Sequence, residues 1–404
     1  MPVAKAVREA LGSSSMIRKM FEEGAELKKK YGDGNVFDFS IGNPDLEPPE
    51  IFQKTLLRLV TENDAGSHGY MSNAGYPYVR AELAKKASRE HGVEINGQHI
   101  IMSVGAAGAL NVILKSILNP DDEVIVSRPY FMEYRSYITN HGGKLIEAAA
   151  TADFNLDIDS IQAALSERTA AVLINSPHNP TGRVYPQKII AALADVLLRH
   201  GKNTGRYPYL IADEPYRELV YGNVTVPPIL CAYPYSLVAT SYSKSLSLPG
   251  ERIGYIAVGP QNDDKETLIN ALVYATRVLG YVNAPALMQR CVAELTEAKA
   301  AIEVYAARRA AFKNTLDAAG LQYIDPEGAF YIFCKTPGSD DDGAFVNELK
   351  KHLILGVPGR SFGAPGWVRF AYCVNEELIR ASAAAFKETA RSFTARSFTA
   401  QAAK

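Results

Sequence analysis

One lysine lies among side chains that suit an anion and a reactive carbonyl group. Ser241-Tyr242-Ser243-Lys244 follows an apolar stretch of the chain, and Arg252 comes eight residues after Lys244. A lysine amine can form a Schiff base with a carbonyl, and an arginine can hold a phosphate through two parallel hydrogen bonds. Taken by itself, the segment is also compatible with a solvated basic loop.

Three further polar segments each follow an apolar stretch. Gly105-Ala106-Ala107-Gly108 begins a helical pattern, and its small residues suit either a phosphate at the helix start or close helix–sheet packing. Asn179 lies in Asn175 to Gly182, which is compatible with a simple turn. Asp213-Glu214-Pro215-Tyr216 ends another strand. A partly buried Asp213 needs a cation, which is either a protein arginine or the protonated ring nitrogen of a cofactor.

The elements that carry these segments alternate between apolar strands and amphipathic helices. We expect strands at 36–41, 99–104, 123–127, 170–175, 209–212, 237–241 and 254–258, and helices at 106–118, 132–140 and 186–200. Strands that are almost entirely apolar, with helices between them, indicate a parallel sheet covered on both faces. The predicted fold class is therefore α/β and doubly wound. In such a sheet ligands bind beyond the carboxyl ends of the strands, where the four polar segments lie.

The chain length of 404 residues allows two or three domains. The pattern from 265 to 319 is helical, with a break near 283–285. We predict an N-terminal segment at 1–50 that joins a small domain, a large cofactor-binding domain at 51–285, a linking helix at 286–320, and the small domain at 321–391. The stretch from Ala390 to Ala400 contains a tandem Ala-Arg-Ser-Phe-Thr repeat, and residues 392–404 are interpreted as a frayed tail.

Composition excludes several classes of protein. The 43 basic and 44 acidic residues give a net charge of -1, which disfavours bulk binding to nucleic acid or to an anionic membrane. No apolar run approaches the length of a membrane span. The four cysteines form no Cys-x-x-Cys pair, so we expect no metal site and no disulfide framework. These features favour a cytoplasmic protein.

The four segments in this order resemble the class I and II aminotransferases, fold-type I enzymes that depend on pyridoxal 5'-phosphate (PLP). The stretch from Ser241 to Tyr255 is similar to the lysine signature of that family, and the resemblance runs from near Phe39 to about Tyr372. It implies a mostly parallel central sheet in a large domain plus a smaller α/β domain, as in the aspartate and aromatic aminotransferases.

The resemblance also implies roles for individual residues around the PLP ring. Lys244 would hold PLP as a Schiff base and then move a proton as general base and acid. Asp213 would pair with the pyridine nitrogen and keep it protonated. Tyr216 and Asn179 would hydrogen-bond the phenolic oxygen of the ring, and Phe131 would stack on it.

Other implied contacts concern the phosphate, the substrate and a second subunit. Tyr70 resembles a tyrosine that reaches the phosphate in the neighbouring subunit, which implies a homodimer with shared active sites. Arg369 resembles the arginine that binds the substrate α-carboxylate, and Gly42 resembles a loop glycine close to it. The phosphate contacts implied by the resemblance come from Ala106, Ala107, Ser241, Ser243 and Arg252.

The expected function is transfer of an amino group between an L-amino acid and a 2-oxo acid, of the aspartate/glutamate or aromatic type. A PLP-dependent lyase or elimination enzyme of the same fold would carry the same residues, so this alternative stays open. A regulatory aminotransferase-like protein is a remote alternative, because Lys244 and Asp213 are both present and no helix-turn-helix precedes the core.

The amino acid donor stays open as well. Many bacterial aspartate aminotransferases have a lysine in the phosphate loop where this chain has Ala107, and Val278 replaces the arginine that reads a distal carboxylate in the animal-type enzymes. We expect the segment from Ser14 to Arg18 and residues near the partner's Tyr281 to line the side-chain pocket. Arg18 and Arg277 are the candidates for binding a distal carboxylate. A dicarboxylate is expected as one substrate, because 2-oxoglutarate is the usual amino acceptor of the family.

Overall fold

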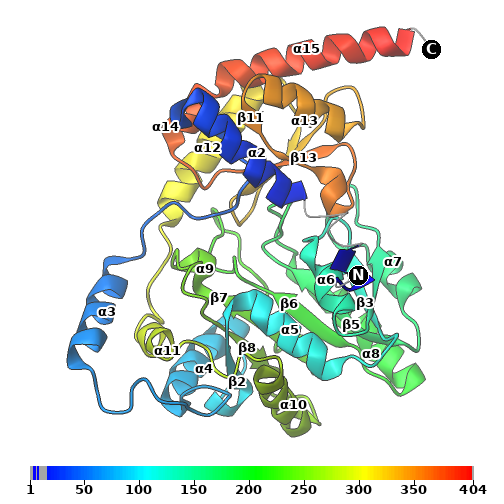
Figure 1. The fold of residues 1–404 in the computed structure, drawn as a ribbon. Coiled ribbons are helices and arrows are strands. Elements are labelled where there is room, and N and C mark those ends of the chain that lie inside the picture. Colours follow the sequence, from blue (N-terminus) through cyan, green and yellow to red (C-terminus); the bar gives the residue numbers. More distant parts are fainter. Residues whose placement is uncertain (1–2, 6, 9–15, 403–404) are drawn as a thin grey trace.

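The largest element of the structure is a seven-stranded sheet (Figure 1). The computed structural model describes residues 3–5, 7–8 and 16–402, without the side chains of residues 16–19, 21 and 396–402. Neighbouring strands are parallel except at β8, which is antiparallel to β7 and β2. In spatial order the strands are β2 (Ile100–Ser103), β8 (Gly254–Val258), β7 (Ser236–Ser241), β6 (Tyr209–Asp213), β5 (Thr169–Asn175), β3 (Glu123–Ser127) and β4 (Lys144–Ala148).

Helices cover this sheet on both faces. In β5, Ala171 and Leu173 point into one apolar core, whereas Val172 and Ile174 point into the other. Successive strand side chains point to opposite faces, so a strand that is apolar throughout needs a helical layer on each side. One layer consists of α5 (Gly105–Ile117), α6 (Glu133–Thr139) and α10 (Lys265–Val278). The other consists of α3 (Glu50–Glu62), α4 (Pro77–His91), α7 (Ile158–Ala164), α8 (Gln187–Thr204) and α11 (Ala286–Ala293). The sheet and these helices form what we call the large lobe.

A second lobe, the small lobe, lies above the large lobe in Figure 1. Its core is built around aromatic rings, such as those of Phe39 and Phe312, whose centroids are 4.8 Å apart. Its antiparallel sheet has the order β12 (Val357–Pro358), β13 (Trp367–Ala371), β10 (Tyr331–Lys335) and β9 (Tyr323–Ile324), and β1 (Phe37–Asp38) pairs in parallel with β11 (Ile354–Leu355). Its helices are α2 (Met16–Tyr31), α12 (Ile302–Ala318), α13 (Asp342–Lys351), α14 (Glu376–Ala381) and α15 (Ala383–Ala402).

The doubly wound α/β prediction is confirmed, and most predicted strands and helices agree with the structure within a few residues. Four elements of the large lobe, α3, α4, β4 and α7, had no counterpart in the prediction. The strand expected at 36–41 is only two residues long, because Phe37 and Asp38 alone pair with Ile354 and Leu355. Short helical turns complete the chain at η1 (Asp33–Asn35), η2 (Gly97–His99), η3 (Gly359–Phe362) and α9 (Tyr242–Ser245).

The single linking helix predicted at 286–320 is wrong. The structure has two helices, α11 and α12, with a non-helical connection from 294 to 301. Leu295 is buried in the core of the large lobe, whereas Tyr305 is buried in the core of the small lobe. The chain must cross from one core to the other between these two side chains, and it leaves the helical conformation to do so.

The frayed tail predicted at 392–404 is also wrong over its described part. Helix α15 continues through the repeat to Ala402. Phe386, Ala390 and Phe393 are all buried, and their spacing of four and three residues forms one apolar stripe along the helix. Ser392 adds a 2.9 Å hydrogen bond from its hydroxyl to Oε1 of Glu348 on α13. The start of the tail therefore packs on the small lobe.

Candidate active site

A cavity of about 310 Å³ lies between the two lobes at the carboxyl ends of β5, β6 and β7. Its volume is at the lower end of the range of small-molecule sites, about 300 Å³ or more. Strand register brings two of its residues together, because Asn175 and Asp213 are paired across β5 and β6. The lining residues include all residues predicted to contact the cofactor or the α-carboxylate except Tyr70: Gly42, Ala106, Ala107, Phe131, Asn179, Asp213, Tyr216, Ser241, Ser243, Lys244, Arg252 and Arg369.

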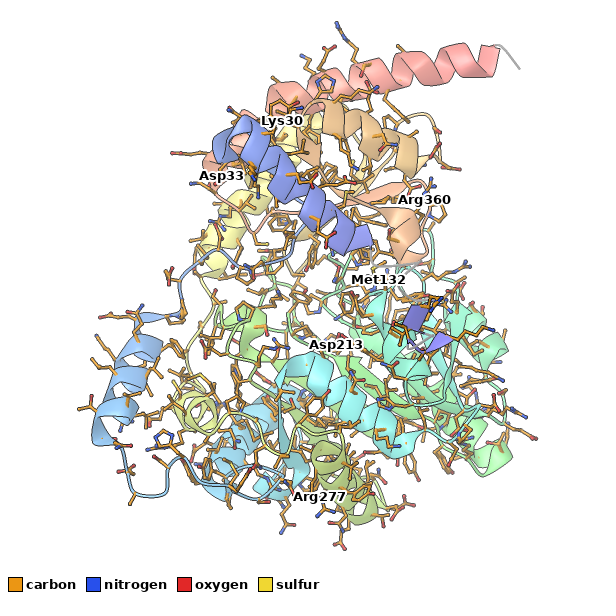
Figure 2. The ribbon with its side chains drawn as sticks, viewed as in Figure 1. Lys30, Asp33, Met132, Asp213, Arg277 and Arg360 are labelled. Atoms are coloured by element: carbon orange, nitrogen blue, oxygen red, sulfur yellow. The ribbon has the colours of Figure 1, made fainter. Side chains whose placement is uncertain are left out.

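Asp213, which is labelled in Figure 2, carries a buried carboxyl group. Its Oδ2 accepts a 2.6 Å hydrogen bond from the Tyr134 hydroxyl, while Oδ1 has no hydrogen-bond partner among the described residues. Burial raises the pKa of Asp213 to about 7, although the hydrogen bond from Tyr134 acts in the opposite direction. A cation next to Oδ1 would stabilise the ionised carboxylate.

Two asparagines fix the loop beside this carboxylate. Asn175 donates from Nδ2 to the backbone oxygen of Asp213 at 2.8 Å, and its Oδ1 accepts from the backbone N–H of Asn179 at 2.7 Å. The side chain of Asn179 is thereby held at the cavity, where its Oδ1 accepts from Nη1 of Arg369 at 3.1 Å. The amide nitrogen of Asn179 stays available to an acceptor in the cavity.

Lys244 reaches across the cavity toward the N-terminal segment. Its Nζ donates a 2.6 Å hydrogen bond to the backbone oxygen of Gly42. Burial lowers the pKa of Lys244 to about 8, and the nearby guanidinium groups of Arg369 and Arg252 act in the same direction. A lysine with a lowered pKa has more of the neutral, nucleophilic amine near neutral pH.

An anion-binding corner lies at the start of α5. Gly105 has φ +77°, and a Cβ at this position would be 2.9 Å from Nη2 of Arg252, so a glycine allows the guanidinium to lie against the helix start. Arg252 itself has φ 51°, and Nη1 donates to the backbone oxygen of Pro249 at 2.8 Å. The N-cap residue of α5, Val104, provides no side-chain cap for the first N–H groups of the helix. Free helix N–H groups beside an arginine suit a phosphate.

Arg369 is the most deeply buried cation of the site, with 2% of its surface exposed. Nη2 donates to the backbone oxygen of Ser40 at 2.7 Å, and Nε has no partner among the described residues. Its guanidinium carbon lies 4.6 Å from the ring centroid of Tyr331 and 5.1 Å from that of Phe362. A buried guanidinium whose Nε has no partner among the described residues suits a carboxylate ligand.

Two predicted residues, Tyr70 and Arg277, do not line this cavity, and others lie outside the described part of the chain. Tyr70 is 95% exposed and does not line it. Arg277 is exposed on α10, and Figure 2 places it at the far side of the large lobe from Asp213. Ser14 and Ser15 lie outside the described residues, and so does the side chain of Arg18.

Sequence reasoning missed two tyrosines of the site. Tyr134 holds Asp213, and Tyr331 lines the cavity with its hydroxyl 2.9 Å from that of Tyr216. Tyr134 comes three residues after Phe131, so a helical turn beginning at Phe131 would have placed both side chains on one face. No signal in the sequence separates Tyr331 from an ordinary core residue of a strand.

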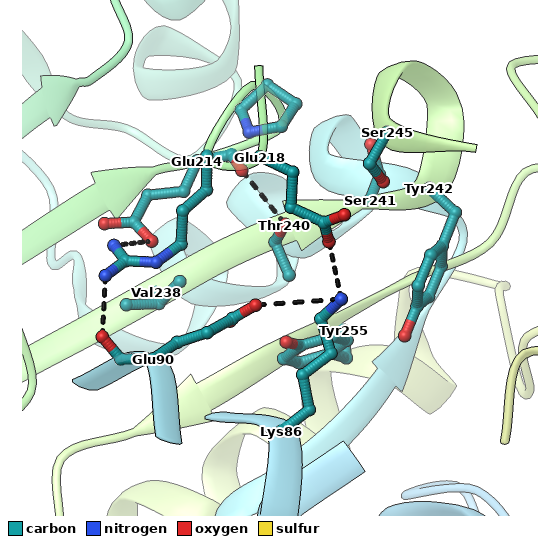
Figure 3. A pocket seen from close by; sticks show the side chains of 12 residues that line it. Lys86, Glu90, Glu214, Glu218, Val238, Thr240, Ser241, Tyr242, Ser245 and Tyr255 are labelled. Carbon is teal, nitrogen blue, oxygen red and sulfur yellow. Dashed lines mark hydrogen bonds and ion pairs between the residues drawn. The ribbon is translucent and has the colours of Figure 1, made fainter. Parts of the chain in front are cut away.

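A second, much smaller pocket lies behind the segment that carries Lys244 (Figure 3). Its volume is about 20 Å³. The amine of Lys86 lies between the carboxylates of Glu90 and Glu218, and Arg217 is 2.9 Å from Glu214. Burial raises the pKa of Glu214 to about 7, while Arg217 opposes that shift. These ion pairs support the corner between β7 and α9 and do not face the active-site cavity.

The residues present fit PLP. The free Oδ1 of Asp213 suits a protonated ring nitrogen, the start of α5 with Arg252 suits a phosphate, and Lys244 suits a Schiff base. Among the described residues, no group of three or more His, Cys, Asp and Glu side chains could hold a metal ion. In that same part of the chain, no helix is both long and apolar enough to cross a membrane.

Comparison with known proteins gives the same class. Residues 34–386 match the family model of the class I and II aminotransferases. The chain is 32% identical to an aspartate/prephenate aminotransferase of Thermus thermophilus over 88% of this chain and 90% of that protein. It is 29% identical to an aspartate aminotransferase of Geobacillus stearothermophilus over 94% of this chain and 96% of that protein.

Solved structures of aminotransferases agree with this family match. An aminotransferase of Eubacterium rectale superposes with a TM-score of 0.93 at 40% identity, covering 97% of this chain and 99% of that chain. The aspartate aminotransferase of Thermus thermophilus with maleate has a TM-score of 0.83 at 29% identity, over 93% and 97% of the two chains.

The chain therefore belongs to the class I and II aminotransferases. It is a PLP-dependent transaminase of the aspartate aminotransferase type, which confirms the family, fold, cofactor and reaction predicted from the sequence.

Proposed function

We propose that Lys244 holds PLP, that Asp213 pairs with its ring nitrogen, and that Arg369 binds the α-carboxylate of the substrate. The observation that carries this assignment is the free, buried Oδ1 of Asp213 in the same cavity as Lys244 and Arg369. When bound, PLP supplies an electron sink for the charge that develops on the substrate Cα. An ionised Asp213 keeps the ring nitrogen protonated and so strengthens that sink.

The other residues orient the two ligands. Ser241, Ser243 and Arg252 bind the phosphate together with the backbone N–H groups of Ala106 and Ala107, and Phe131 stacks on the ring. Tyr216 and Asn179 donate to the phenolic oxygen, and Arg369 and Gly42 lie at the carboxylate. With the substrate held in this way, the amine of Lys244 is placed to move a proton at the substrate Cα as general base and then as general acid.

The substrates are an L-amino acid and a 2-oxo acid, and we propose that a dicarboxylate serves as one of them. Relatives named as aspartate and aspartate/prephenate aminotransferases support this choice. Among the described residues that line the cavity, the basic ones are Lys244, Arg252 and Arg369, all of which already have roles. A distal carboxylate therefore requires a further cation, for which Arg18 and the partner's Arg277 are the candidates.

The active form is a homodimer in the cytoplasm. Tyr70, at 95% exposure, stands free of its own cavity, as expected for a side chain that completes the phosphate site of a second copy. Leu57 and Val60 on α3 are likewise exposed apolar side chains, at 70% and 56%. A reducing compartment agrees with the free state of all four cysteines.

One assay tests the function and the substrate class together. The purified enzyme is given a panel of L-amino acids with 2-oxoglutarate, pyruvate or oxaloacetate. We expect a new amino acid and a new 2-oxo acid in equal amounts, without release of ammonia. Release of ammonia with no amino acid product would instead show elimination and would overturn the proposal.

A further inference from the structure

Tyr331 connects the two lobes at the active-site cavity. It lies on β10 of the small lobe and is only 3% exposed, yet its side chain lines the cavity. Its hydroxyl lies 2.9 Å from the hydroxyl of Tyr216, which follows β6 of the large lobe. The two rings meet edge to face, with centroids 5.7 Å apart. Tyr331 of the small lobe therefore contacts Tyr216, the proposed hydrogen-bond donor to the phenolic oxygen of PLP.

The ring of Tyr331 also supports the proposed carboxylate clamp. Strands β10 and β13 pair so that Phe333 lies opposite Arg369, and the guanidinium carbon of Arg369 is 4.6 Å from the Tyr331 ring centroid. A guanidinium over an aromatic face is attracted to it and keeps its N–H groups free for a carboxylate at the edge. The ring thus limits the directions in which Arg369 can point.

The hydroxyl of Tyr331 has a different effect from the ring. A phenol has one hydrogen to donate. If Tyr216 uses its hydrogen on an acceptor in the cavity, the hydrogen bond between the two tyrosines requires that Tyr331 be the donor to Tyr216. A hydroxyl that accepts a hydrogen bond becomes a stronger donor itself. Burial raises the pKa of Tyr331 to about 12, so its hydroxyl keeps its hydrogen near neutral pH.

A close contact with Gly42 fixes the position of the hydroxyl. A Cβ added to Gly42 would lie 2.0 Å from the Tyr331 hydroxyl, so the two groups are in direct contact and no larger residue fits between them. The backbone oxygen of Gly42 accepts the hydrogen bond from Lys244. Tyr331 therefore contacts Arg369 and Tyr216 directly, and it is linked to Lys244 through Gly42.

We propose that Tyr331 is a positioning residue that couples the α-carboxylate site at Arg369 to the strength of the Tyr216 hydrogen bond on PLP. The inference rests on the proposed function, because it assumes the roles given to Tyr216 and Arg369. The ring of Tyr331 holds Arg369, and the hydroxyl of Tyr331 makes Tyr216 a stronger hydrogen-bond donor. Two substitutions of Tyr331 can therefore separate the two effects.

The first variant, Tyr331→Phe, keeps the ring and removes the hydroxyl. Weaker donation by Tyr216 leaves more negative charge on the phenolic oxygen, which holds the neighbouring Schiff-base proton more tightly. The pH midpoint of the visible absorbance change of the bound cofactor should rise by about half a pH unit. The KM for L-alanine should stay within about twofold, since the ring still supports Arg369.

The second variant, Tyr331→Leu, removes the ring. The KM for L-alanine should rise by about fivefold or more, because an arginine without its stacking partner is less well oriented. Tyr372→Phe is the matched control. It removes another buried hydroxyl of the small lobe, one that contacts Tyr221 and the backbone oxygen of Ala329 and does not line the cavity.

The absorbance titration needs no turnover, so it remains informative if the substrate assignment fails. An unchanged midpoint in Tyr331→Phe, or an equal shift in Tyr372→Phe, would overturn the proposed effect of the hydroxyl. An unchanged KM in a folded Tyr331→Leu variant would overturn the effect of the ring. Failure of the proposed function would look different, as absence of transamination in the unmodified enzyme.

Discussion

The Tyr134 hydroxyl donates a 2.6 Å hydrogen bond to Oδ2 of Asp213, and Oδ1 of the same carboxylate has no partner among the described residues. Tyr134 is a neutral donor, so it orients the carboxylate without balancing its charge. The buried anion is therefore incomplete in the protein alone, and its pKa is raised to about 7 by burial. A cationic ring nitrogen would supply the missing charge.

The stability of the cofactor-free protein should depend on pH through this carboxyl group. The folded-state pKa of Asp213 is about 7, above the ordinary value of about 3.9, so its contribution to stability is full below about pH 4 and is lost as the pH rises to about 7. Asp213→Asn removes this titration. Between about pH 5 and pH 8 the cofactor-free variant should lose less stability than the unmodified protein, by at most about 3 kcal/mol. Urea unfolding at both pH values measures the difference, and identical losses in the two proteins would contradict the prediction.

Loss of the carboxylate should separate cofactor binding from turnover. In Asp213→Ala, PLP should remain attached through Lys244 and the phosphate contacts, and kcat should fall by roughly a hundredfold or more because the ring nitrogen loses its proton. Absorbance measures the bound cofactor, and a coupled assay measures kcat. Near-normal turnover would mean that Asp213 does not protonate the ring.

Lys244 should be the attachment point of PLP. The purified protein should be yellow, and borohydride should fix the cofactor on the peptide that contains Lys244. Because the pKa of Lys244 is lowered to about 8, attachment to the cofactor-free protein should become faster as the pH rises through about 8, where the free amine forms. Peptide mapping and a pH series of the attachment rate test both points. A label on another lysine would refute the assignment.

The residues that the sequence identified and those it missed differ in their local context. Lys244, Asp213 and Asn179 lie in short polar segments directly after apolar strands, so their own neighbours distinguish them. Tyr331 is the first residue of the buried strand β10, and its contact with Tyr216 joins residues 115 positions apart. Only the pairing of β10 with β13 and the packing of one lobe on the other create that contact. Periodicity reports the face of an element but not its tertiary partner.

The same dependence on tertiary packing explains why the single helix predicted at 286–320 is wrong. The pattern there is helical on both sides of the break, and no proline or glycine marks residues 294–301. The helix ends because Leu295 and Tyr305 belong to different cores, and this requirement comes from the arrangement of the lobes. At the tail, in contrast, the stripe of Phe386, Ala390 and Phe393 is visible in the sequence, and its helical spacing favours a packed helix over the frayed tail that we predicted.

Tyr70 should act in the active site of a second subunit. Tyr70→Phe removes only the hydroxyl, and loss of a hydrogen bond to a charged phosphate should weaken PLP binding by about tenfold or more. Tyr31→Phe, which alters another exposed tyrosine far from the cavity lining, is the control. PLP dissociation by equilibrium dialysis gives the affinity, and sedimentation gives the oligomeric state. A fully active monomer at low protein concentration would be incompatible with shared sites.

The last prediction concerns a distal carboxylate. Arg277 is exposed and lies on the far side of its own large lobe, with its guanidinium carbon 5.7 Å from the ring centroid of Tyr274, so we expect it to act, if at all, at the cavity of a second subunit. If Arg277 or Arg18 binds a distal carboxylate, its replacement by Ala should raise the KM for glutamate or aspartate far more than that for alanine. A desolvated charge pair lost in this way costs about 2–5 kcal/mol, roughly thirtyfold or more in KM. If neither substitution discriminates between these substrates, the side-chain pocket is chiefly apolar, and aromatic or aliphatic amino acids should be the better donors. Equal losses for alanine and glutamate in both variants would show that the two arginines support folding rather than recognition.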